Sequence, residues 1–498
     1  LNPLLQNPYM AIHPPMMYIG YVGFAIPFAF GMAALITKRL DDEWIHISRK
    51  LSLIPWVFLS AGLILGGLWA YEELGWGGYW AWDPVENAGL LPWITGTAFL
   101  HSIRIQERRD MLKIWNMVLV ILTFLLTIIG TFLTRSGIVE SVHSFAQSNI
   151  GYYFFTFIVI ATLVSFGFLI ARLKYLKSEH QLESLLSKEF AFLLNNWILL
   201  GAAFFVLIAT IFPSLSAWLI GEKITVGPKF FNTWMVPIGL TILFLSGFAP
   251  LVSWKKTPIP VLFRQFFFPS ISFIITLIVI IFLDSDHLLS AFTFALCVFV
   301  VAGIIQEYYQ GIKIKKKTKD INVFDAIIGL IVKGKRRYVG YIIHFGIALM
   351  FLGFAGNSYN HEIEMPLKPG QKATVKDYII TYHEMTTHES PHKVEFSAKL
   401  SVQKENQSEI RTIFPQKWLY RGQEEQMTTE VVIQSSLFED LYVVLASFSD
   451  QSDIVNFKFI INPLVSWVWI GTLVLILGTI ILLWPERSRN IASKLKDL

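Results

Sequence analysis

Residues 51–103 read LSLIPWVFLSAGLILGGLWAYEELGWGGYWAWDPVENAGLLPWITGTAFLHSI. Two apolar stretches, 51–70 and 88–103, flank a loop at 71–89 that is rich in tryptophan and glycine. The first stretch is long enough to cross the hydrocarbon core of a bilayer as a helix, and the second is short for a full span. Two apolar helices joined by an aromatic loop predict a polytopic membrane protein.

The composition of the whole chain supports this class. Of 498 residues, 54% are hydrophobic and only 15% are charged, with a mean hydropathy of +0.53. Soluble domains carry about 25% charged residues. The single cysteine excludes an internal disulfide, a CxxC redox centre and a thiolate zinc site. The net charge of +5 is too modest to support a nucleic-acid partner.

Apolar stretches recur along the chain, and eleven of them are candidate transmembrane helices. The sixth is long enough to break or tilt near Pro213. The eleven stretches lie at about 16–37, 51–70, 88–103, 114–133, 151–171, 192–220, 230–253, 266–283, 287–305, 338–356 and 463–484.

Lysine and arginine in the connecting segments predict the orientation of these spans. Alternate segments are basic, and together they hold 28 Lys and Arg residues, whereas the short loops between them hold three. The basic set is therefore expected on the cytoplasmic side, which places loop 71–89 on the outer side. The basic segments are 38–50, 104–113, 172–191, 254–265, 306–337 and 485–498.

Residues 357–462 follow the tenth span and are expected outside the membrane. Apolar and polar residues alternate there, as in Phe396 to Val402 and Phe457 to Ile461, which is the pattern of half-buried strands. The predicted fold class is therefore an all-α polytopic membrane protein with one small extracytoplasmic β domain. Residues 1–356 hold ten spans, 357–462 the β domain, and 463–498 the last span with a cytoplasmic tail.

The loop at 71–89 carries the strongest functional signal. Tryptophans at a membrane interface usually anchor a helix end, and that role explains one or two of Trp76, Trp80 and Trp82. It explains poorly a cluster interleaved with glycines, because glycine lets a backbone approach a flat ligand closely. We interpret the loop as an aromatic shelf for a ligand. The shelf consists of Trp76, Gly77, Gly78, Tyr79, Trp80, Trp82 and Asp83.

The sequence WGGYWAWDPVEN resembles the WWD signature of haem-handling membrane proteins in cytochrome c maturation. The segments HPPMMYIGYVGFAIPFAF (13–30) and GTFLTRSGIVESVHSF (130–145) narrow the resemblance to the CcmF family, the haem lyase of the System I pathway. The resemblance covers nearly all of the chain. Tyr79 departs from it, since the family more often has tryptophan there. The family also carries spans ahead of the HPP segment, so we expect upstream spans to complete the protein.

Four histidines are candidate iron ligands. His13 and His143 are expected on the same membrane face as the shelf, where two imidazoles can supply both axial ligands of a haem. His101 and His344 lie inside spans at similar depth, and ionisable residues there are functional candidates. The resemblance implies that the first pair ligates the haem on the shelf and the second a resident haem b. The alternatives are ordinary interfacial histidines and, for His101, a polar cap on a short span.

Three charged residues lie near the shelf. Arg135 is suited to a haem propionate, and its alternative role is a snorkelling helix end. Asp83 and Glu86 would repel propionates. They are expected to fix a histidine tautomer, to cap the third helix, or to pair with Arg135.

The resemblance implies a reaction. The protein receives haem from a membrane-tethered haem chaperone and helps to join its vinyl groups to the thiols of CxxCH in an apocytochrome c. The substrate brings its own thiols, so no protein nucleophile is expected, and the residues Trp76, Trp80, Trp82, Asp83 and Glu86 position the haem. The resident haem relays electrons, with a membrane quinol as the implied donor. Partners are the chaperone, the apocytochrome and thiol-handling maturation subunits, at the bacterial inner membrane.

Other functions fit part of the same sequence. A haem transporter or channel would use the same shelf and histidines, but it predicts a polar path and an internal repeat, and we find few interior charges and no repeat. Another WWD protein is the second alternative, either the two-component synthase or a paralogue specialised for nitrite reductase maturation. A scaffold subunit that only gathers partners is the third.

Overall fold

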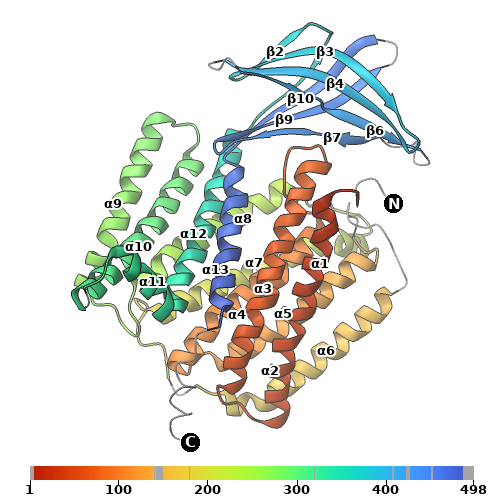
Figure 1. Cartoon of the computed structure of the whole chain (residues 1–498). Coiled ribbons are helices and arrows are strands. Elements are labelled where there is room, and N and C mark those ends of the chain that lie inside the picture. The colour runs from red at the N-terminus through yellow and green to blue at the C-terminus, as the bar shows by residue number, and fades with distance from the viewer. Residues whose placement is uncertain are drawn as a thin grey trace, which may run out of the picture.

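The computed structural model describes residues 5–139, 141, 150–178, 180–318, 320–405, 409–421, 427–449 and 452–485. A bundle of membrane-length helices forms one part, and a β domain stands on one end of it (Figure 1). The β domain is inserted between the last two helices of the bundle, α12 and α13, so the chain enters and leaves it at the same end.

The helices follow the predicted apolar stretches closely. Their bounds are α1 Pro8–Gly23, α2 Ala25–Thr37, α3 Glu43–Glu73, α4 Pro84–Arg109, α5 Lys113–Arg135, α6 Gly151–Arg172, α7 Lys188–Ile220, α8 Pro228–Leu251, α9 Ile259–Leu283, α10 Leu288–Thr318, α11 Val323–Lys333, α12 Lys335–Gly356 and α13 Ser466–Leu483. Two short 3₁₀ turns, Leu173–Leu176 and Asn357–Tyr359, follow α6 and α12.

Ten helical segments in the described part of the chain are long and apolar enough to span a membrane, against the eleven that were expected. The exception is α4, which covers the predicted third span. This helix is 26 residues long and packs against α3, α5 and α7, with Leu91, Phe99 and Ile103 fully buried. Its last turns are polar and charged, which lowers its mean hydropathy although it lies in the interior of the bundle.

Three details differ from the sequence expectation. The first span begins at Pro8, so His13 lies within α1 instead of ahead of the span. Helix α7, 33 residues long from Lys188 to Ile220, continues through Pro213 without a break. The short helix α11 lies in a segment that was expected to be a basic loop. This helix was not predicted because its amphipathic pattern covers only 11 residues and lies in a lysine-rich segment.

The closest helix packing joins α12 to α13 through glycines. A Cβ atom built on Gly471 would lie 2.5 Å from the carbonyl oxygen of Gly346, and one built on Gly346 would lie 2.6 Å from that of Gly471. Small residues let membrane helices approach backbone to backbone, where van der Waals contact drives their association. Since Gly346 is two residues from His344, this contact also fixes the helix that carries one candidate ligand.

The β domain is formed by two packed antiparallel sheets, which confirms the predicted β fold. One sheet has the strand order β1-β10-β9-β8 and the other β2-β3-β4-β6-β7, with β5 paired to β4. The alternating residues predicted to face inward, such as Leu400, Phe457 and Phe459, are fully buried. The strands are β1 His361–Leu367, β2 Lys372–Val375, β3 Tyr378–Glu389, β4 Lys393–Lys404, β5 Ile410–Ile413, β6 Gln416–Tyr420, β7 Thr428–Glu430, β8 Val432–Ser435, β9 Glu439–Ser449 and β10 Ser452–Pro463.

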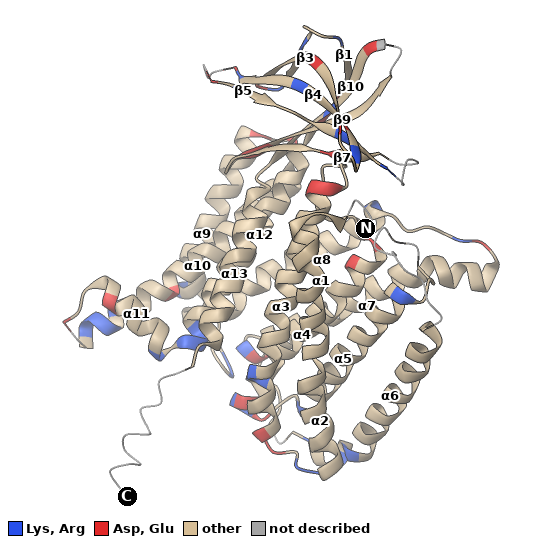
Figure 2. Cartoon of the chain, turned by 45° about the vertical axis from the view of Figure 1, so that its right-hand side comes forward, with Lys and Arg blue, Asp and Glu red and all other residues tan. Residues whose placement is uncertain are grey.

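Lysine and arginine residues gather at the end of the bundle away from the β domain (Figure 2). The loop between α3 and α4 lies at the opposite end, directly beneath the β domain (Figure 1). The positive-inside rule predicts that the basic end of the bundle is cytoplasmic and that the β domain lies outside. This sidedness stays a prediction.

Candidate functional site

The aromatic loop leads into α4 through a well-defined cap. Asp83 is the N-cap residue, and its carboxylate accepts a hydrogen bond of 2.9 Å from the backbone N–H of Val85. The carboxylate of Glu86 accepts from the N–H groups of Ala81 and Asp83, which completes a capping box. Capping was one of three roles that the sequence left open for these two carboxylates.

The glycines of the loop face the β domain. Gly75 and Gly77 have positive φ angles of 68° and 82°, which other residues rarely adopt. A Cβ atom on Gly77 would lie 2.2 Å from Cδ1 of Ile460, and one on Gly75 would lie 3.3 Å from Thr429. The expectation that the glycines serve the approach of a flat ligand is therefore incomplete, because two of them fit the loop against β7 and β10.

A buried polar network fastens the same loop to the β domain. The amide of Asn462 donates to the carbonyl of Gly77 and to the hydroxyl of Tyr71, each at 2.9 Å. The Tyr71 hydroxyl in turn donates to the carboxylate of Asp440 at 3.2 Å. All three side chains lie in the interior, with 3%, 1% and 4% of Tyr71, Asp440 and Asn462 exposed. Sequence reasoning missed this network, since its members lie up to 391 residues apart.

A cavity with acidic walls opens beside this network, between α3 and the β domain, and Glu72, Glu73 and Glu430 line it. Burial first, and then the charge of Glu73, raise the pKa of Glu430 from its ordinary 4.5 to about 7. The carboxylate of Glu395 acts in the same direction, while Thr428 and Lys393 oppose it.

We expect the folded protein to lose stability as the pH rises from about 4.5 to about 7. The folded state holds a proton on Glu430 in this range that the unfolded chain has released, so folding is favoured at the acidic end. The loss is on the order of 2 kcal/mol after allowance for partial exposure. Thermal unfolding in detergent at pH 5 and pH 8 measures it. In Glu430→Gln the difference should shrink, and an unchanged difference would contradict the assignment.

The aromatic rings of the loop point to different partners. Trp82 stacks on Phe231 of α8 with ring centroids 5.0 Å apart, and its indole N–H donates to Asn232. Tyr79 packs between Trp469 and Phe354. Trp76, 36% exposed, lines a pocket together with Gly77, Gly78 and Tyr79. Trp80 contacts Trp82 edge to face at 5.8 Å.

These positions revise the picture of one flat shelf. Trp82 and Tyr79 anchor the loop to the helices on either side of it, and Trp76 is left as the exposed ring of the pocket.

His13 lies against α3 next to the loop. Its Nδ1–H donates to the carbonyl of Gly62 at 2.7 Å, which assigns the proton to Nδ1 and leaves Nε2 the acceptor. A Cβ atom on Gly66 would lie 2.8 Å from the imidazole, and one on Gly67 would lie 3.2 Å from the Tyr79 carbonyl. His13 and the loop thus both approach α3 at the same level along its axis, at two adjacent glycines.

The second outer histidine, His143, lies outside the described residues. Ser141, two residues earlier in the sequence, is described, and its hydroxyl donates to the carboxylate of Asp83 at 2.6 Å. Arg135 donates to the hydroxyl of Tyr18 on α1 at 3.3 Å. Its role toward a propionate stays a prediction.

The two inner histidines lie close together in the bundle. The ring centroids of His101 on α4 and His344 on α12 are 6.2 Å apart, with planes inclined by 37°. Nδ1 of His101 donates to the carbonyl of Thr97 at 2.9 Å, and Nδ1 of His344 is buried without a hydrogen-bond partner among the described residues. Phe192 of α7 lies 5.8 Å from the His101 ring. From the sequence, the similar depth of the two histidines made this pair geometrically possible, and the resemblance implied it.

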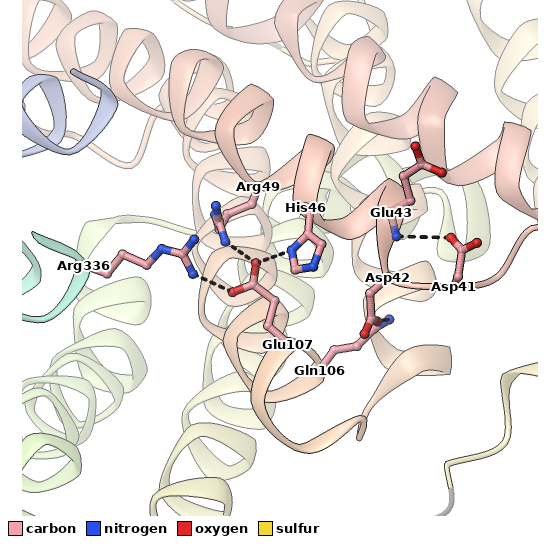
Figure 3. Close-up of polar contacts among 8 residues, drawn as sticks. All are labelled: Asp41, Asp42, Glu43, His46, Arg49, Gln106, Glu107 and Arg336. Atoms are coloured by element: carbon pink, nitrogen blue, oxygen red, sulfur yellow. Dashed lines mark hydrogen bonds and ion pairs between the residues drawn. The ribbon is translucent and has the colours of Figure 1, made fainter. Parts of the chain in front are cut away.

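Below the pair, a cluster of charges ties three helices together (Figure 3). Glu107, near the end of α4, accepts from Nδ1 of His46 and from Arg336, each at 3.0 Å, and forms an ion pair with Arg49. Its side chain is 7% exposed. The cluster fixes α4 against α3 and α12, and thereby the register of the helices that carry the histidines. From the sequence, Arg49 and Arg336 were counted only as topology signals, and Glu107 was given no role.

Comparison with known proteins defines the class of this molecule as membrane proteins of cytochrome c assembly. The family model "Cytochrome C assembly protein" matches residues 1–139, and the model "CcmF C-terminal beta-sandwich" matches residues 358–463. The chain belongs to the CcmF family, as its resemblance implied.

The similar proteins span the whole of this chain. The cytochrome c-type biogenesis protein CcmF of Pseudomonas aeruginosa is 34% identical over 98% of this chain and 73% of its own length. CcmF of Escherichia coli is 31% identical, and the match covers 100% of this chain and 74% of that protein. NrfE of Haemophilus influenzae is 29% identical, and the match covers 98% of this chain and 75% of that protein. The solved structure of "Cytochrome c Heme Lyase CcmF" has a TM-score of 0.79 at 28% identity, and the match covers 96% of this chain and 73% of that one.

Proposed function

We propose that this protein is a cytochrome c haem lyase that holds two haems, one as substrate and one as resident cofactor. The observation that carries the proposal is the pair of inner histidines, whose ring centroids lie 6.2 Å apart. Two imidazole nitrogens that each lie about 2 Å from one metal ion place their ring centres roughly 6 Å apart. The spacing therefore fits axial ligation of a haem iron by His101 and His344.

The donor set also fits this cofactor. Among the described residues there is no group of three or more His, Cys, Asp or Glu side chains that could hold a metal ion. An isolated pair of histidines suits an iron whose other four ligands come from a porphyrin. Because Nδ1 of His101 donates to Thr97, its Nε2 is the atom that would ligate the iron. When bound, such a haem supplies one-electron transfer, with a membrane quinol as the proposed donor.

The substrate haem binds on the side of the β domain, at the loop and the outer histidines. His13 and His143 ligate its iron, Trp76, Gly77, Gly78, Tyr79 and Trp80 form its surroundings, and Arg135 pairs with a propionate. Trp82, Asp83 and Glu86 hold the loop on α8 and α4. The hydrogen bond from Ser141 to Asp83, and the positions of His13 and the Tyr79 carbonyl against adjacent residues of α3, support one composite site.

The reaction is the addition of a cysteine thiol across a haem vinyl group. A bond forms between sulfur and one vinyl carbon, the thiol proton passes to the other carbon, and no net oxidation occurs. The two cysteines belong to the CxxCH segment of an apocytochrome c, so this chain needs to contribute positioning and not a nucleophile. A haem chaperone delivers the haem, and thiol-handling subunits present the apocytochrome, on the outer face of a bacterial inner membrane.

The visible spectrum of the purified protein tests the resident haem. We expect haem b absorbance in the wild type and its loss in His101→Ala and in His344→Ala. His287→Ala, in which the exchanged histidine bonds Asp284 at the start of α10, is the matched control and should keep the spectrum. Absence of haem b from the wild type, or full absorbance in both inner variants, would overturn the proposal.

Assembly of c-type cytochromes in cells tests the outer site separately. His13→Ala and His143→Ala should abolish assembly while the haem b absorbance remains. The alternative of a haem transporter predicts haem flux into sealed vesicles that depends on the same residues. Service to a specialised set of cytochromes is the other alternative.

A further inference from the structure

Three cationic side chains from three helices surround the inner histidine pair on the side away from the β domain. Arg104 follows His101 by three residues on α4, about 4.5 Å along the axis. Arg337 precedes His344 by seven residues, two turns of α12. Lys188 precedes Phe192, whose ring contacts His101, by one turn of α7. The spacings of three, seven and four residues place each cation on the face of its helix that points to the site.

Arg104 has no counter-charge. No hydrogen bond or ion pair joins its guanidinium to another described residue, although the side chain is only partly exposed. Its charged neighbours are the guanidinium groups of Arg108, Arg336 and Arg337, which repel it. An unpaired cation that has lost part of its hydration is costly unless an anion compensates it.

The carboxylates of this region are already engaged. Glu107 is shared by Arg336, Arg49 and His46, as described above. Glu307 pairs with Arg337 and also accepts from the hydroxyl of Tyr341 at 2.8 Å. Glu189 pairs with Arg109 and accepts from the backbone of Lys255. These three carboxylates are therefore engaged by other groups, and none of them forms an ion pair with Arg104.

The other two cations are held in place by neutral or paired groups. Nε of Arg337 donates to the Tyr341 hydroxyl at 3.0 Å, which together with Glu307 orients the guanidinium. Lys188 donates to the carbonyl of Pro250 at 3.3 Å and lies over the ring of Trp254. The site is thus a set of oriented donors around one guanidinium that lacks an acceptor.

We propose that Arg104, with Arg337 and Lys188 beside it, forms a carboxylate site for the propionate groups of the haem held by His101 and His344. This inference rests on the proposed function. A guanidinium offers parallel N–H donors that match a carboxylate, and a haem brings two carboxylates to within one or two helical turns of its ligands. In this arrangement the propionates would lie on the side of the histidine pair away from the β domain.

The carboxylate requirement is tested by haem binding to the full-length protein, purified in detergent from haem-depleted cells. Haem b and its dimethyl ester, which lacks the propionate charges, are titrated separately and followed by their Soret absorbance. We expect the wild type to bind haem b at least tenfold more tightly than the diester. In Arg104→Ala the two affinities should come within threefold, and Arg104→Lys should keep part of the preference. Arg108→Ala, an exposed arginine of the same helix, is the control and should keep all of it.

The possible outcomes separate this inference from the proposed function. If neither haem b nor the diester binds the wild type, the resident haem itself is refuted. If both bind equally well, the haem stands and the propionate site is refuted. If the preference survives in Arg104→Ala, Arg104 is not the residue that makes it.

A lipid is the competing anion. If the wild type shows no preference and Arg104→Ala loses a co-purified anionic phospholipid, the cations serve a lipid headgroup and the propionate site is again refuted.

A second readout is the reduction potential of the bound haem. It should fall in Arg104→Ala, because a nearby cation that favours the more negative reduced state has been removed.

Discussion

Gly471→Leu is expected to prevent α13 from packing on α12 and to remove most of the folded protein. The added Cβ atom would lie 2.5 Å from the Gly346 carbonyl oxygen and 2.7 Å from the Met350 nitrogen. Both contacts are with backbone, which cannot give way as a side chain tip can. We expect a loss of about 3 kcal/mol or more, at the upper end for overpacking. The fraction of protein that stays monodisperse in detergent after heating measures the effect.

Gly340→Leu is the matched control, because Gly340 lies on α12 and a Cβ atom there would meet nothing within 4 Å. The control should be as stable as the wild type. Gly471→Leu should also lose haem b absorbance, because α13 packs on α12 and α12 carries His344. A fully stable, haem-loaded Gly471→Leu protein would refute the described packing of the two helices.

The second large effect is expected from Asn462→Leu, which replaces the amide by an apolar group of similar size. The carbonyl of Gly77 and the hydroxyl of Tyr71 each lose a donor at 2.9 Å inside the protein. Each unsatisfied buried group costs about 1–3 kcal/mol, so we expect a total of about 2–4 kcal/mol. Because the lost bonds hold the aromatic loop, assembly of c-type cytochromes should fall while haem b absorbance remains.

Asn456→Leu serves as its control. This asparagine lies on the same strand, β10, and its amide donates to Ser447 at the surface, so its loss should have little effect on either measurement. A double substitution with Tyr71→Phe tests the network, since coupled residues are not additive. Additive effects of the two substitutions, or equal losses in Asn456→Leu, would count against a role for Asn462 in holding the loop.

Periodicity and charge were sufficient to predict most of the helices. Apolar stretches report burial in lipid directly, and strand alternation reports the inner faces of the sheets, as at Leu400 and Phe457. Helix α4 shows where this signal weakens. Its polar last turn, with Gln106 and Glu107, serves contacts with other helices, so its hydropathy is too low for a membrane span although the helix is buried.

The site was predictable in its chemistry but not in its contacts. The placement and orientation of both helices made the histidine pair geometrically possible, and the resemblance implied it. The partners of the loop glycines did not follow, because Ile460 and Asn462 come from strands whose pairing depends on the fold of the β domain. Arg104 was counted as one basic residue of a loop, and only the packing of three helices reveals that it lacks a counter-charge.

The contact between Gly77 and Asn462 joins residues 385 positions apart. A ribosome that adds about 5–20 residues per second makes the second partner about 20 to 80 seconds after the first. During that interval the aromatic loop exists without its support from β9 and β10. The part of the molecule encoded early is therefore the part completed last. Only a fully translated chain presents this loop in its final shape, and an unfinished one cannot offer it to a ligand.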